Sequence, residues 1–495
     1  MNRLLAAIVA VVMAATLVAG CSKGDGRKLG TLSNPTEIAG KPITYGPSGF
    51  RQGAPGPTRK IENTDNGEID QLAAMAISDV EEFWTGAYGP PLQGKFTPVN
   101  AVFSWDPRFK HGTFCGNSTF GFINAQWCDF GRPAQNCPSD GSACRPSFNT
   151  IGWDRGALMP DERAAHGDMA VALVLAHEYG HAISWEIAKT LKGNSLPVYL
   201  ASEQQADCFA GVYMRWVVDG KSRRFTLTTG DGLTNLLVAL VGLRDPLVAQ
   251  IDPTVEMLYH GSAFERVTAF QFGFADGISA CTKMTAAEVE QRRKNLPKDL
   301  LEQGQTGEFL ITQDSVRSAV DALNKQFSPE NPPVVSFDQP SCPDARTSPP
   351  ASYCPSTNTI NVDMNKLVVM GTSLGRGTPL DTKPTVVFGD YTAYSVLLSR
   401  YMLAMQNQRG GLSLDNESAG MRTACLTGVA TTKLVTDPNF KLSGGDLDEA
   451  VTGVLTNGMV AANVNGDSVP SAFARLDAFR TGVLGDEDRC YKRWQ

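Results

Sequence analysis

Beyond its first 20 residues, the sequence has no apolar run long enough to cross a membrane. It also has no stripe of basic residues, because 44 lysines and arginines stand against 51 aspartates and glutamates, for a net charge of −7. We therefore do not expect nucleic acid as a partner. No two cysteines have the C-x-x-C spacing, which argues against a zinc site made of cysteines.

The N-terminal segment is the one long apolar stretch. Its sequence, MNRLLAAIVAVVMAATLVAGC, has a basic start at Arg3, an apolar run and small residues before Cys21, as export signals do. The ending LVAGC resembles a lipobox, the bacterial lipoprotein signal in which cleavage precedes the cysteine and the cysteine receives lipid. The alternatives are an ordinary signal peptide or a transmembrane anchor, but the run is short for a span. We expect a signal peptide at residues 1–20 and a lipid on Cys21 that anchors the protein to the extracytoplasmic face of the cell membrane.

The segment after Cys21 is rich in glycine, proline, serine and charged residues, with few large apolar ones. This composition is typical of flexible chain, so residues 21–66 are predicted to form a lipidated tether. The chain has 495 residues, 42% of them hydrophobic, which is enough for two or three domains.

Two long segments of the sequence repeat each other in the same order. SAFERVTAFQFGFADGISAC at 262–281 matches SAFARLDAFRTGVLGDEDRC at 471–490, and PSFNTIGWD at 146–154 matches PSTNTINVD at 355–363, both at an offset of 209. Chance similarity between amphipathic helices is the alternative. Two further matches lie between these in the same order, which favours a duplication with changed loop lengths: GDMAVALVLAHEYGHAIS (167–184) with GDYTAYSVLLSRYMLAMQ (389–406), and ADCFAGV (206–212) with TACLTGV (423–429).

Each copy has the same predicted order of elements. A first helix is followed by strands, a cysteine-bearing loop, a short strand at NTI and a long apolar helix, and further helices end the copy. This pattern indicates an α+β fold with a small sheet beside helices, in two related domains. The predicted first helices span 69–88 and 312–327, the strands 99–106 and 333–338, and the long helices 167–189 and 389–408. The predicted domains span 67–282 and 312–495, joined by a helical connecting segment at 283–311.

The motif HEYGH places two histidines on one face of a helix in the first copy. His177 and His181 lie one turn apart, so both imidazoles can bind one tetrahedral zinc ion. Glu178 points aside from that face and can reach a water on the metal, as a general base must. Gly180 allows close approach of a facing element.

A second motif, SEQQADCFAG at 202–211, supplies the third ligand that a catalytic zinc needs. Glu203 and Asp207 are four residues apart and so share a helix face. We expect Glu203 to bind the metal and Asp207 to accept the free ring N–H of His177, which fixes the tautomer of that histidine. One zinc ion per chain is predicted.

HExxH followed by ExxxD resembles the gluzincin class of metallopeptidases. The closer resemblance, carried by AHEYGHAIS, EQQADCFAGV and HGSAFERV, is to the bacterial family of putative neutral zinc metallopeptidases, whose actinobacterial members are lipoproteins. It covers roughly residues 67–282 and implies peptide hydrolysis. The cysteine-rich loop at 111–148 is longer than in the usual member, so we expect a reshaped substrate cleft.

The resemblance also draws attention to His260, since gluzincins often use a downstream histidine or tyrosine to stabilise the oxyanion. His260 is expected in this role, with Tyr259 as the substitute and a helix-capping histidine as the alternative. The segment NTIGWD at 149–154 could be the edge strand along which a peptide substrate adds.

The second copy has lost every one of these chemical residues. Alignment of the copies predicts a degenerate domain without metal, in which the position of Glu178 is taken by Arg400. A buried unpaired guanidinium is costly, so we expect Arg400 to face solvent or a carboxylate. The other replacements are His177 by Ser399, His181 by Leu403, Glu203 by Gly420, Asp207 by Ala424 and His260 by Val469.

Eleven cysteines agree with an exported protein. With Cys21 set aside, an even number remains and suggests five disulfides. The duplication matches two pairs, and the remaining cysteines lie in loops of each copy. The predicted disulfides are Cys208–Cys281, Cys425–Cys490, Cys342–Cys354 and, by analogy, Cys115–Cys144 with Cys128–Cys137 nested inside.

Together these features predict a membrane-anchored zinc metallopeptidase that cleaves peptides or proteins through a zinc-activated water. Two other functions stay open. One is a non-catalytic binding lipoprotein with a structural zinc, and the other is a zinc amidase that acts on cell-wall peptides.

Overall fold

The structure is a computed structural model. It describes residues 34, 36–128, 149–190, 199–245, 260–297, 308–338, 340–373, 387–438, 440 and 442–495. The predicted signal peptide and Cys21 lie outside these residues. Among the helices described, none combines the length and the apolar character that a membrane span requires.

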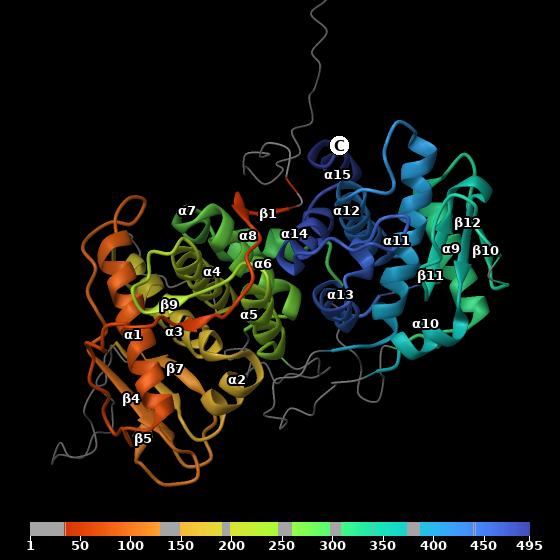
Figure 1. Cartoon of the computed structure of the whole chain (residues 1–495). Helices are drawn as coiled ribbons and strands as arrows, with labels where there is room; N and C mark the ends of the chain where they lie inside the picture. The colour runs from red at the N-terminus through yellow and green to blue at the C-terminus, as the bar shows by residue number, and fades with distance from the viewer. Residues whose placement is uncertain are drawn as a thin grey trace, which may run out of the picture.

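The first half of the chain packs a layer of helices against a three-stranded sheet (Figure 1). The strand order is β4-β8-β7, with β8 parallel to β4 and antiparallel to β7. All five residues of β8 are buried, because the strand is central. The elements are α1 (Glu68–Ala87), β4 (Ala101–Trp105), β7 (Ala125–Cys128), β8 (Thr150–Asp154), α2 (Leu158–His166), α3 (Asp168–Thr190), α4 (Tyr199–Val218), α5 (Asp231–Gly242), α6 (Ala263–Asp276) and α7 (Ile278–Cys281).

This strand order corrects one prediction. The segment at 149–154 was expected to be an edge strand for substrate, but β8 pairs with a strand on each side and has no free edge. The free edge next to the α3 helix belongs to β7, which within the described residues pairs only with β8.

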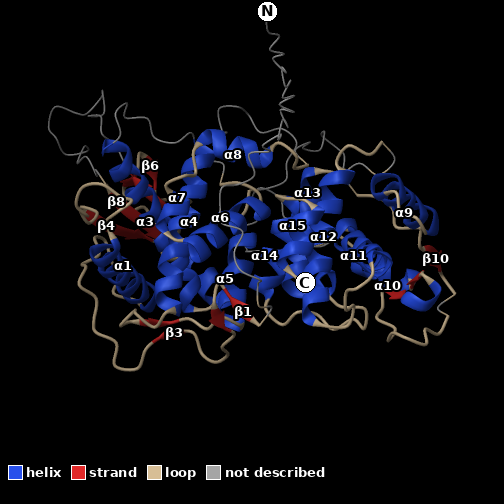
Figure 2. Ribbon diagram, turned by 90° about the horizontal axis from the view of Figure 1, so that it is seen from above, coloured by secondary structure: helices blue, strands red, loops and turns tan. Residues whose placement is uncertain are grey.

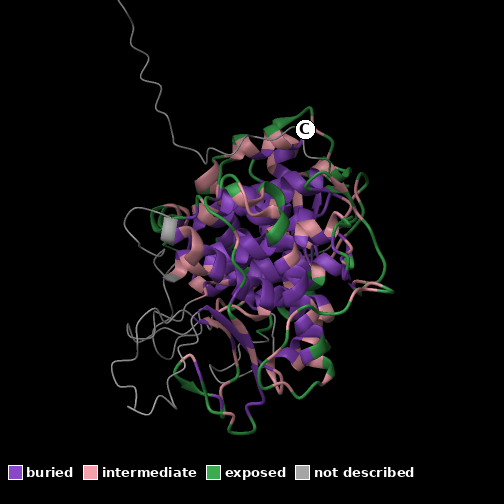
Figure 3. Cartoon of the chain, turned by 90° about the vertical axis from the view of Figure 1, so that its left-hand side faces the viewer, coloured by how far each residue is buried: buried purple, intermediate pink, exposed green. Residues whose placement is uncertain are grey.

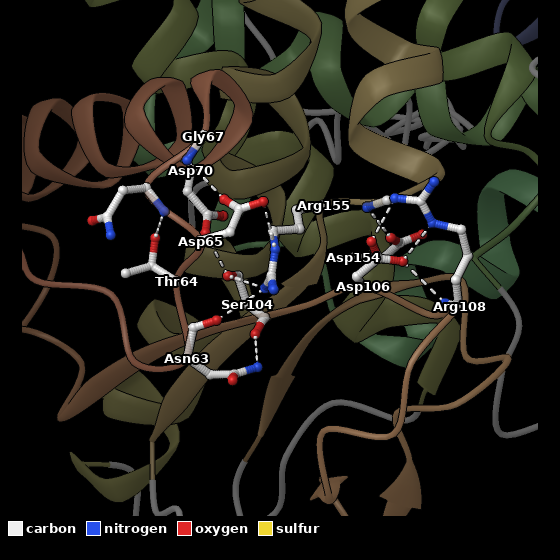
Figure 4. Close-up of polar contacts among 12 residues, drawn as sticks. Asn63, Thr64, Asp65, Gly67, Asp70, Ser104, Asp106, Arg108, Asp154 and Arg155 are labelled. Atoms are coloured by element: carbon white, nitrogen blue, oxygen red, sulfur yellow. Dashed lines mark hydrogen bonds and ion pairs between the residues drawn. The ribbon is translucent and has the colours of Figure 1, made fainter.

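The segment that precedes α1 is ordered against the first half from residue 36 on. Its strand β3 (Gly49–Phe50) pairs with β9 (Phe225–Thr226), and its short strands β1 (Glu37–Ile38) and β2 (Lys41–Pro42) form a hairpin. Further along, Asn63 Nδ2 donates to the carbonyl of Ser104 in β4 (Figure 4). The prediction of a flexible tether is therefore wrong for residues 36–66.

Polar contacts at the ends of β4 and β8 determine where α2 begins (Figure 4). The Asp154 carboxylate accepts the backbone N–H groups of Gly156, Ala157 and Leu158 at 2.6, 3.0 and 2.9 Å. Leu158 is the first residue of α2 and Ala157 is its N-cap, so the carboxylate satisfies the N–H groups where the helix begins. The chain thus turns from the central strand into α2 and then into the long helix α3.

A hairpin of β5 (Thr113–Phe114) and β6 (Asn117–Ser118) corrects two predicted disulfides. The ring of Phe114 stacks on Trp105 of β4, which brings Cys115 to the end of β7, where it is bonded to Cys128. The predicted pairs Cys115–Cys144 and Cys128–Cys137 are therefore wrong. Cys137 and Cys144 lie outside the described residues.

The second half has the same order of elements and the same strand pairing. Its sheet has the order β10-β12-β11, with β12 parallel to β10 and antiparallel to β11. Helix α8 (Ala286–Arg293) lies in the predicted connecting segment. The elements are α9 (Gln313–Phe327), β10 (Val334–Ser336), β11 (Ala351–Cys354), β12 (Thr359–Val362), α10 (Met364–Met370), α11 (Asp390–Arg409), α12 (Glu417–Leu434), α13 (Gly444–Thr456), α14 (Ala472–Val483) and α15 (Glu487–Arg493), with 3-10 turns at Pro355–Thr357 and Met459–Ala461.

Glycines allow one helix pair in each half to pack with backbones in contact. A Cβ added at Gly273 of α6 would overlap the carbonyl of Cys208 in α4, and a Cβ at Gly482 of α14 would overlap the carbonyl of Cys425 in α12. In each half a disulfide also joins the first helix of the pair to the short helix that follows the second, Cys208 of α4 to Cys281 of α7 and Cys425 of α12 to Cys490 of α15. The structure confirms the predicted pairs Cys208–Cys281 and Cys425–Cys490, and also Cys342–Cys354.

The two sheets lie at opposite ends of the molecule, with the helices between them (Figure 2). The halves meet where α5 and α6 pack against α13 and α14, and one hydrophobic cluster extends through both. Figure 3 shows that buried residues dominate the helical layer. The architecture is thus a mixed α+β fold, as predicted.

Candidate metal centre

Helices α3 and α4 bring the two sequence motifs together. Gly180 makes this possible, because a Cβ at that position would lie 2.7 Å from the Cα of Ala206 in α4. HEYGH lies in the middle of α3, and Glu203 and Asp207 lie in the second and third turns of α4. His177, Glu178 and Asp207 are buried, whereas the His181 and Glu203 side chains are 13% and 19% exposed.

Three side-chain atoms converge at this contact. Nε2 of His177 lies 3.2 Å from Nε2 of His181 and 3.2 Å from Oε2 of Glu203, and the latter two atoms are 3.4 Å apart. Ligands about 2.0–2.1 Å from a tetrahedral zinc ion lie about 3.3–3.4 Å from one another. Oε2 of Glu203 accepts no hydrogen bond within the described residues although it is buried. The three residues therefore fit a zinc ion.

Asp207 contacts His177 through the ring nitrogen that is not one of the converging atoms. Its Oδ1 lies 2.8 Å from Nδ1 of His177, so the ring presents Nε2 toward Glu203. Arg266 of α6 binds the same carboxylate with two donors, Nε to Oδ2 at 3.0 Å and a terminal nitrogen to Oδ1 at 2.9 Å. All three side chains are buried, which makes this row of charges rigid.

The charges in the site shift the pKa values of Asp207, His177 and Glu203. Burial alone would raise the pKa of Asp207, but the charges of Arg266 and His177 lower it. Burial alone would lower the pKa of His177, but the charge and hydrogen bond of Asp207, with smaller contributions from Glu203 and Glu178, raise it to about 10. Burial would likewise raise the pKa of Glu203, but His181 and His260 hold it well below its usual range. A bound metal ion would take the place of the proton on His177.

Glu178 lies apart from the three converging atoms. Its Oε2 accepts the backbone N–H of Trp127, 2.7 Å away, which belongs to the edge strand β7. The indole of Trp127 stacks beside His181, with ring centroids 6.4 Å apart, and contacts Trp185 at 6.0 Å. A carboxylate, an edge strand and two aromatic rings therefore border the metal-binding atoms.

His260 also lies near Glu203. Its Nε2 is 3.8 Å from Oε2 of Glu203, and its Nδ1 is 3.4 Å from Oδ1 of Asp245. Burial would lower its pKa, but Glu203 and Asp245 outweigh this and raise it. His260 is not the N-cap of the described helix that follows it, since the N-cap of α6 is Ser262. Tyr259 lies outside the described residues.

The matching positions of the second half contain no comparable set. Arg400 is buried, and the expectation that it faces solvent or a carboxylate is wrong. It donates instead to the carbonyls of Ala351, Met459 and Asn463 at 3.0, 3.1 and 3.5 Å. Carbonyl dipoles satisfy the donors without a counter-charge, and burial lowers the pKa of Arg400 to about 10.

Two other groups of possible ligand residues occur among the described residues. Cys342 and Cys354 with Asp344 form one, but the cysteines are bonded to each other. Glu308, Asp390 and Glu449 form the other, a set of carboxylates without a histidine. Neither resembles the nitrogen-rich set around His177.

Sequence reasoning missed two residues of the site. Arg266 was not singled out, because its match in the repeat is also an arginine, Arg475, and only residues that differ between the two segments were considered for chemistry. Trp127 was overlooked because its segment was assigned to a cysteine-bearing loop. The signal that could have identified Arg266 is the pattern in the aligned segments: the arginine is kept as Arg475, whereas alanine, Ala424, stands at the position of Asp207.

When the chain is compared with known protein families, a match covers most of its first half. The model of a family described as putative neutral zinc metallopeptidase matches residues 43–284. The match includes every residue of the metal centre and also the N-terminal strand β3. No curated protein and no solved structure matches the chain.

Proposed function

Residues 43–284 belong to the family of putative neutral zinc metallopeptidases, and from this we propose that the chain is a zinc endopeptidase anchored by lipid on Cys21 at the extracytoplasmic face of the cell membrane. The observation that carries the proposal is the convergence of His177, His181 and Glu203, with the neighbouring residue Glu178 bound to the edge strand β7.

In this proposal each residue of the centre has its own role in hydrolysis. His177, His181 and Glu203 would hold Zn²⁺, which would supply a Lewis acid for the peptide carbonyl and make a bound water more acidic. Glu178 accepts a proton from the attacking water and passes it to the leaving amine nitrogen. Asp207 keeps His177 in the tautomer that leaves Nε2 free.

His260 donates a hydrogen bond to the oxyanion of the tetrahedral intermediate in this proposal. Its support is position: Nε2 lies 3.8 Å from Glu203 Oε2 without being part of the converging set. The substrate would be a peptide or an unfolded protein that lies along β7 as an added strand. The backbone of β7 already contacts Glu178 through Trp127, which brings such a peptide to the base.

The second half is proposed to be a degenerate copy of the first. Support comes from the equal order of elements, the equal strand pairing and the matched disulfides of Cys208 and Cys425. With Ser399, Leu403 and Gly420 at the ligand positions, it would hold no metal, so one zinc ion per chain is proposed.

The test is hydrolysis by the zinc-loaded full chain. Unfolded proteins and peptidoglycan fragments are incubated separately, and the products are identified by mass spectrometry. Cleavage of internal peptide bonds in proteins supports the endopeptidase. Products from peptidoglycan alone would replace it by an amidase, and no product from either would leave a structural zinc. Release of a Cys21→Ala variant from membranes tests the anchor.

A further inference from the structure

Helix α6 is held at its start by the second half. Asp448 of α13 is completely buried, and its Oδ1 accepts the backbone N–H of Phe264, the second residue of α6, at 3.2 Å. The N–H of Ala263 also donates to this carboxylate. A carboxylate at a helix N-terminus stabilises both the unpaired N–H groups and the helix dipole.

The helix supplies only part of its own cap. Ser262 Oγ accepts the N–H of Glu265, and the Glu265 carboxylate accepts the N–H of Ser262. Among the described residues of the first half, this capping box leaves the N–H groups of Ala263 and Phe264 without a partner. Asp448 satisfies both, so the first turn of α6 is completed across the boundary between the halves.

The same carboxylate lies beside the segment that holds His260. Nε of Arg244 is 3.8 Å from Oδ2 of Asp448. The next residue, Asp245, accepts the N–H of Gly261 at 2.6 Å and faces Nδ1 of His260.

Farther along, α6 is covered by α14 of the second half. Gln271 Nε2 donates to the carbonyl of Phe473 at 3.0 Å, and the rings of Phe274 and Phe473 lie 4.9 Å apart. The guanidinium of Arg480 lies over Phe272, 4.3 Å from the ring centroid. The orientation of α6 is therefore set by both of its ends.

The orientation of α6 affects the metal-binding atoms through three side chains that contact one another. Arg266, two residues after Phe264, binds Asp207 with two donors, and Asp207 holds the ring of His177. A rotation or shift of α6 would move the guanidinium and release the carboxylate from its fixed position.

We infer that the second half is a built-in scaffold for the metal centre: Asp448 fixes the start of α6 and so positions Arg266, Asp207 and His177. A half without metal-binding residues thereby contributes to zinc affinity. The hydrolysis readout rests on the proposed function, whereas the zinc-affinity readout does not.

The experiment compares Asp448→Ala with Asp446→Ala in the full chain. Both residues are buried on α13, but the Asp446 carboxylate accepts hydrogen bonds from Ser443, within the second half. Zinc dissociation constants are measured by chelator competition, and kcat and KM with a peptide. Groups in contact with a ligand residue typically change affinity by 10–100-fold; Asp448 is farther away, so we expect Asp448→Ala to raise Kd about threefold to tenfold and to lower kcat with little change in KM. Asp446→Ala should leave zinc affinity unchanged.

Asp448→Asn keeps an oxygen that accepts the two N–H groups, so its zinc Kd should lie between the wild-type and Asp448→Ala values. Should Asp448→Ala fail to fold, Asp448→Asn is compared with Asp446→Asn in its place. Equal zinc affinity in the Asp448 and Asp446 variants overturns the scaffold. A wild-type chain that binds zinc but cleaves nothing overturns the proposed function alone.

Discussion

The backbone N–H of Trp127 donates a hydrogen bond to Oε2 of Glu178, with 2.7 Å between the two atoms. The proposed base is thus tied to the edge strand along which the substrate is proposed to lie. Because the donor is backbone, the contact depends on the position of β7 and not on the tryptophan side chain.

Glu178→Gln should separate metal binding from hydrolysis. Glutamine keeps an oxygen that can accept the Trp127 N–H, and Glu178 is outside the converging set, so zinc content should stay at the wild-type value. Loss of a general base typically lowers the rate by about 10²–10⁴-fold. Metal analysis and kcat are measured on the same sample. Hydrolysis at the wild-type rate would rule out Glu178 as the base.

The double variant His177→Ala/His181→Ala should bind no zinc. Removal of two nitrogen ligands leaves Glu203 alone at the site, which cannot hold a tetrahedral ion. Wild-type protein should contain one zinc per chain after dialysis. A full equivalent retained by the variant would point to the carboxylates of Glu308, Asp390 and Glu449 instead.

Arg266→Lys should raise the zinc dissociation constant by about 10-fold or more. About 10-fold is the lower end of the range that is typical when a residue that orients a metal ligand is changed. Lysine cannot bind both oxygens of Asp207 in the way that the guanidinium does. The matched control is Arg475→Lys, since Arg475 donates only to carbonyls of the second half, among them those of Val454 and Leu455. Equal losses in the two variants would contradict the positioning role.

Gly273→Ala and Gly482→Ala should destabilise the protein by similar amounts, about 3 kcal/mol or more, because each new methyl overlaps a backbone carbonyl of the packed helix. Gly86→Ala is the control. It lies in α1 with nothing near its added Cβ, so alanine should stabilise by up to about 1 kcal/mol. Urea unfolding measures all three. Tolerance at only one of the matched glycines would weaken the case for a shared packing plan.

Asp446 should make stability depend on pH. Burial, assisted by the charge of Asp390, raises its pKa to about 8, although hydrogen bonds from Ser443 oppose the shift. Its reference value is 3.8, so between these pH values the folded state binds more protons than the unfolded state. The contribution of this group is fully present below pH 3.8 and is lost as pH rises through about 8, by about 1 kcal/mol per unit.

Asp446→Asn should remove this part of the pH dependence, so the variant should gain stability over the wild type from pH 5 to about 8 in urea titrations. Other buried carboxyl groups contribute to the wild-type slope, among them Glu162, whose burial raises its pKa to about 7. The difference between the two proteins isolates Asp446. Parallel slopes would show that its carboxyl is ionised in the folded protein at neutral pH.

The sequence predicted the parts of the fold that local patterns determine. The 3.6-residue period and the HExxH and ExxxD spacings located α3 and α4, and the repeat located the matching helices and two disulfides. The convergence of His177, His181 and Glu203 followed from these patterns because residues four apart share a helix face.

Such local patterns could not predict contacts between segments that lie far apart in the sequence. Strands β7 and β11 are only four residues each, and both end in a disulfide cysteine, so they were taken for loop. The Cys115–Cys128 bond depends on how the β5–β6 hairpin folds over the sheet, and spacing alone leaves connectivity open. Residues 36–66 have few apolar side chains, and their order comes from backbone pairing with β9 and β4.

The position of Arg400 also limits the chemistry that the second half could support. Its guanidinium joins β11 to the 3-10 turn at Met459 and to Asn463, much as a metal ion would join separate elements. A glutamate placed at this position would face three carbonyl oxygens, and its buried charge would be repelled. Metal ligands introduced at Ser399, Leu403 and Gly420 would therefore not make a working site unless the surrounding backbone changed as well. The backbone around Arg400 is matched to a cation on a side chain, so no single substitution would turn this half into a second metal centre.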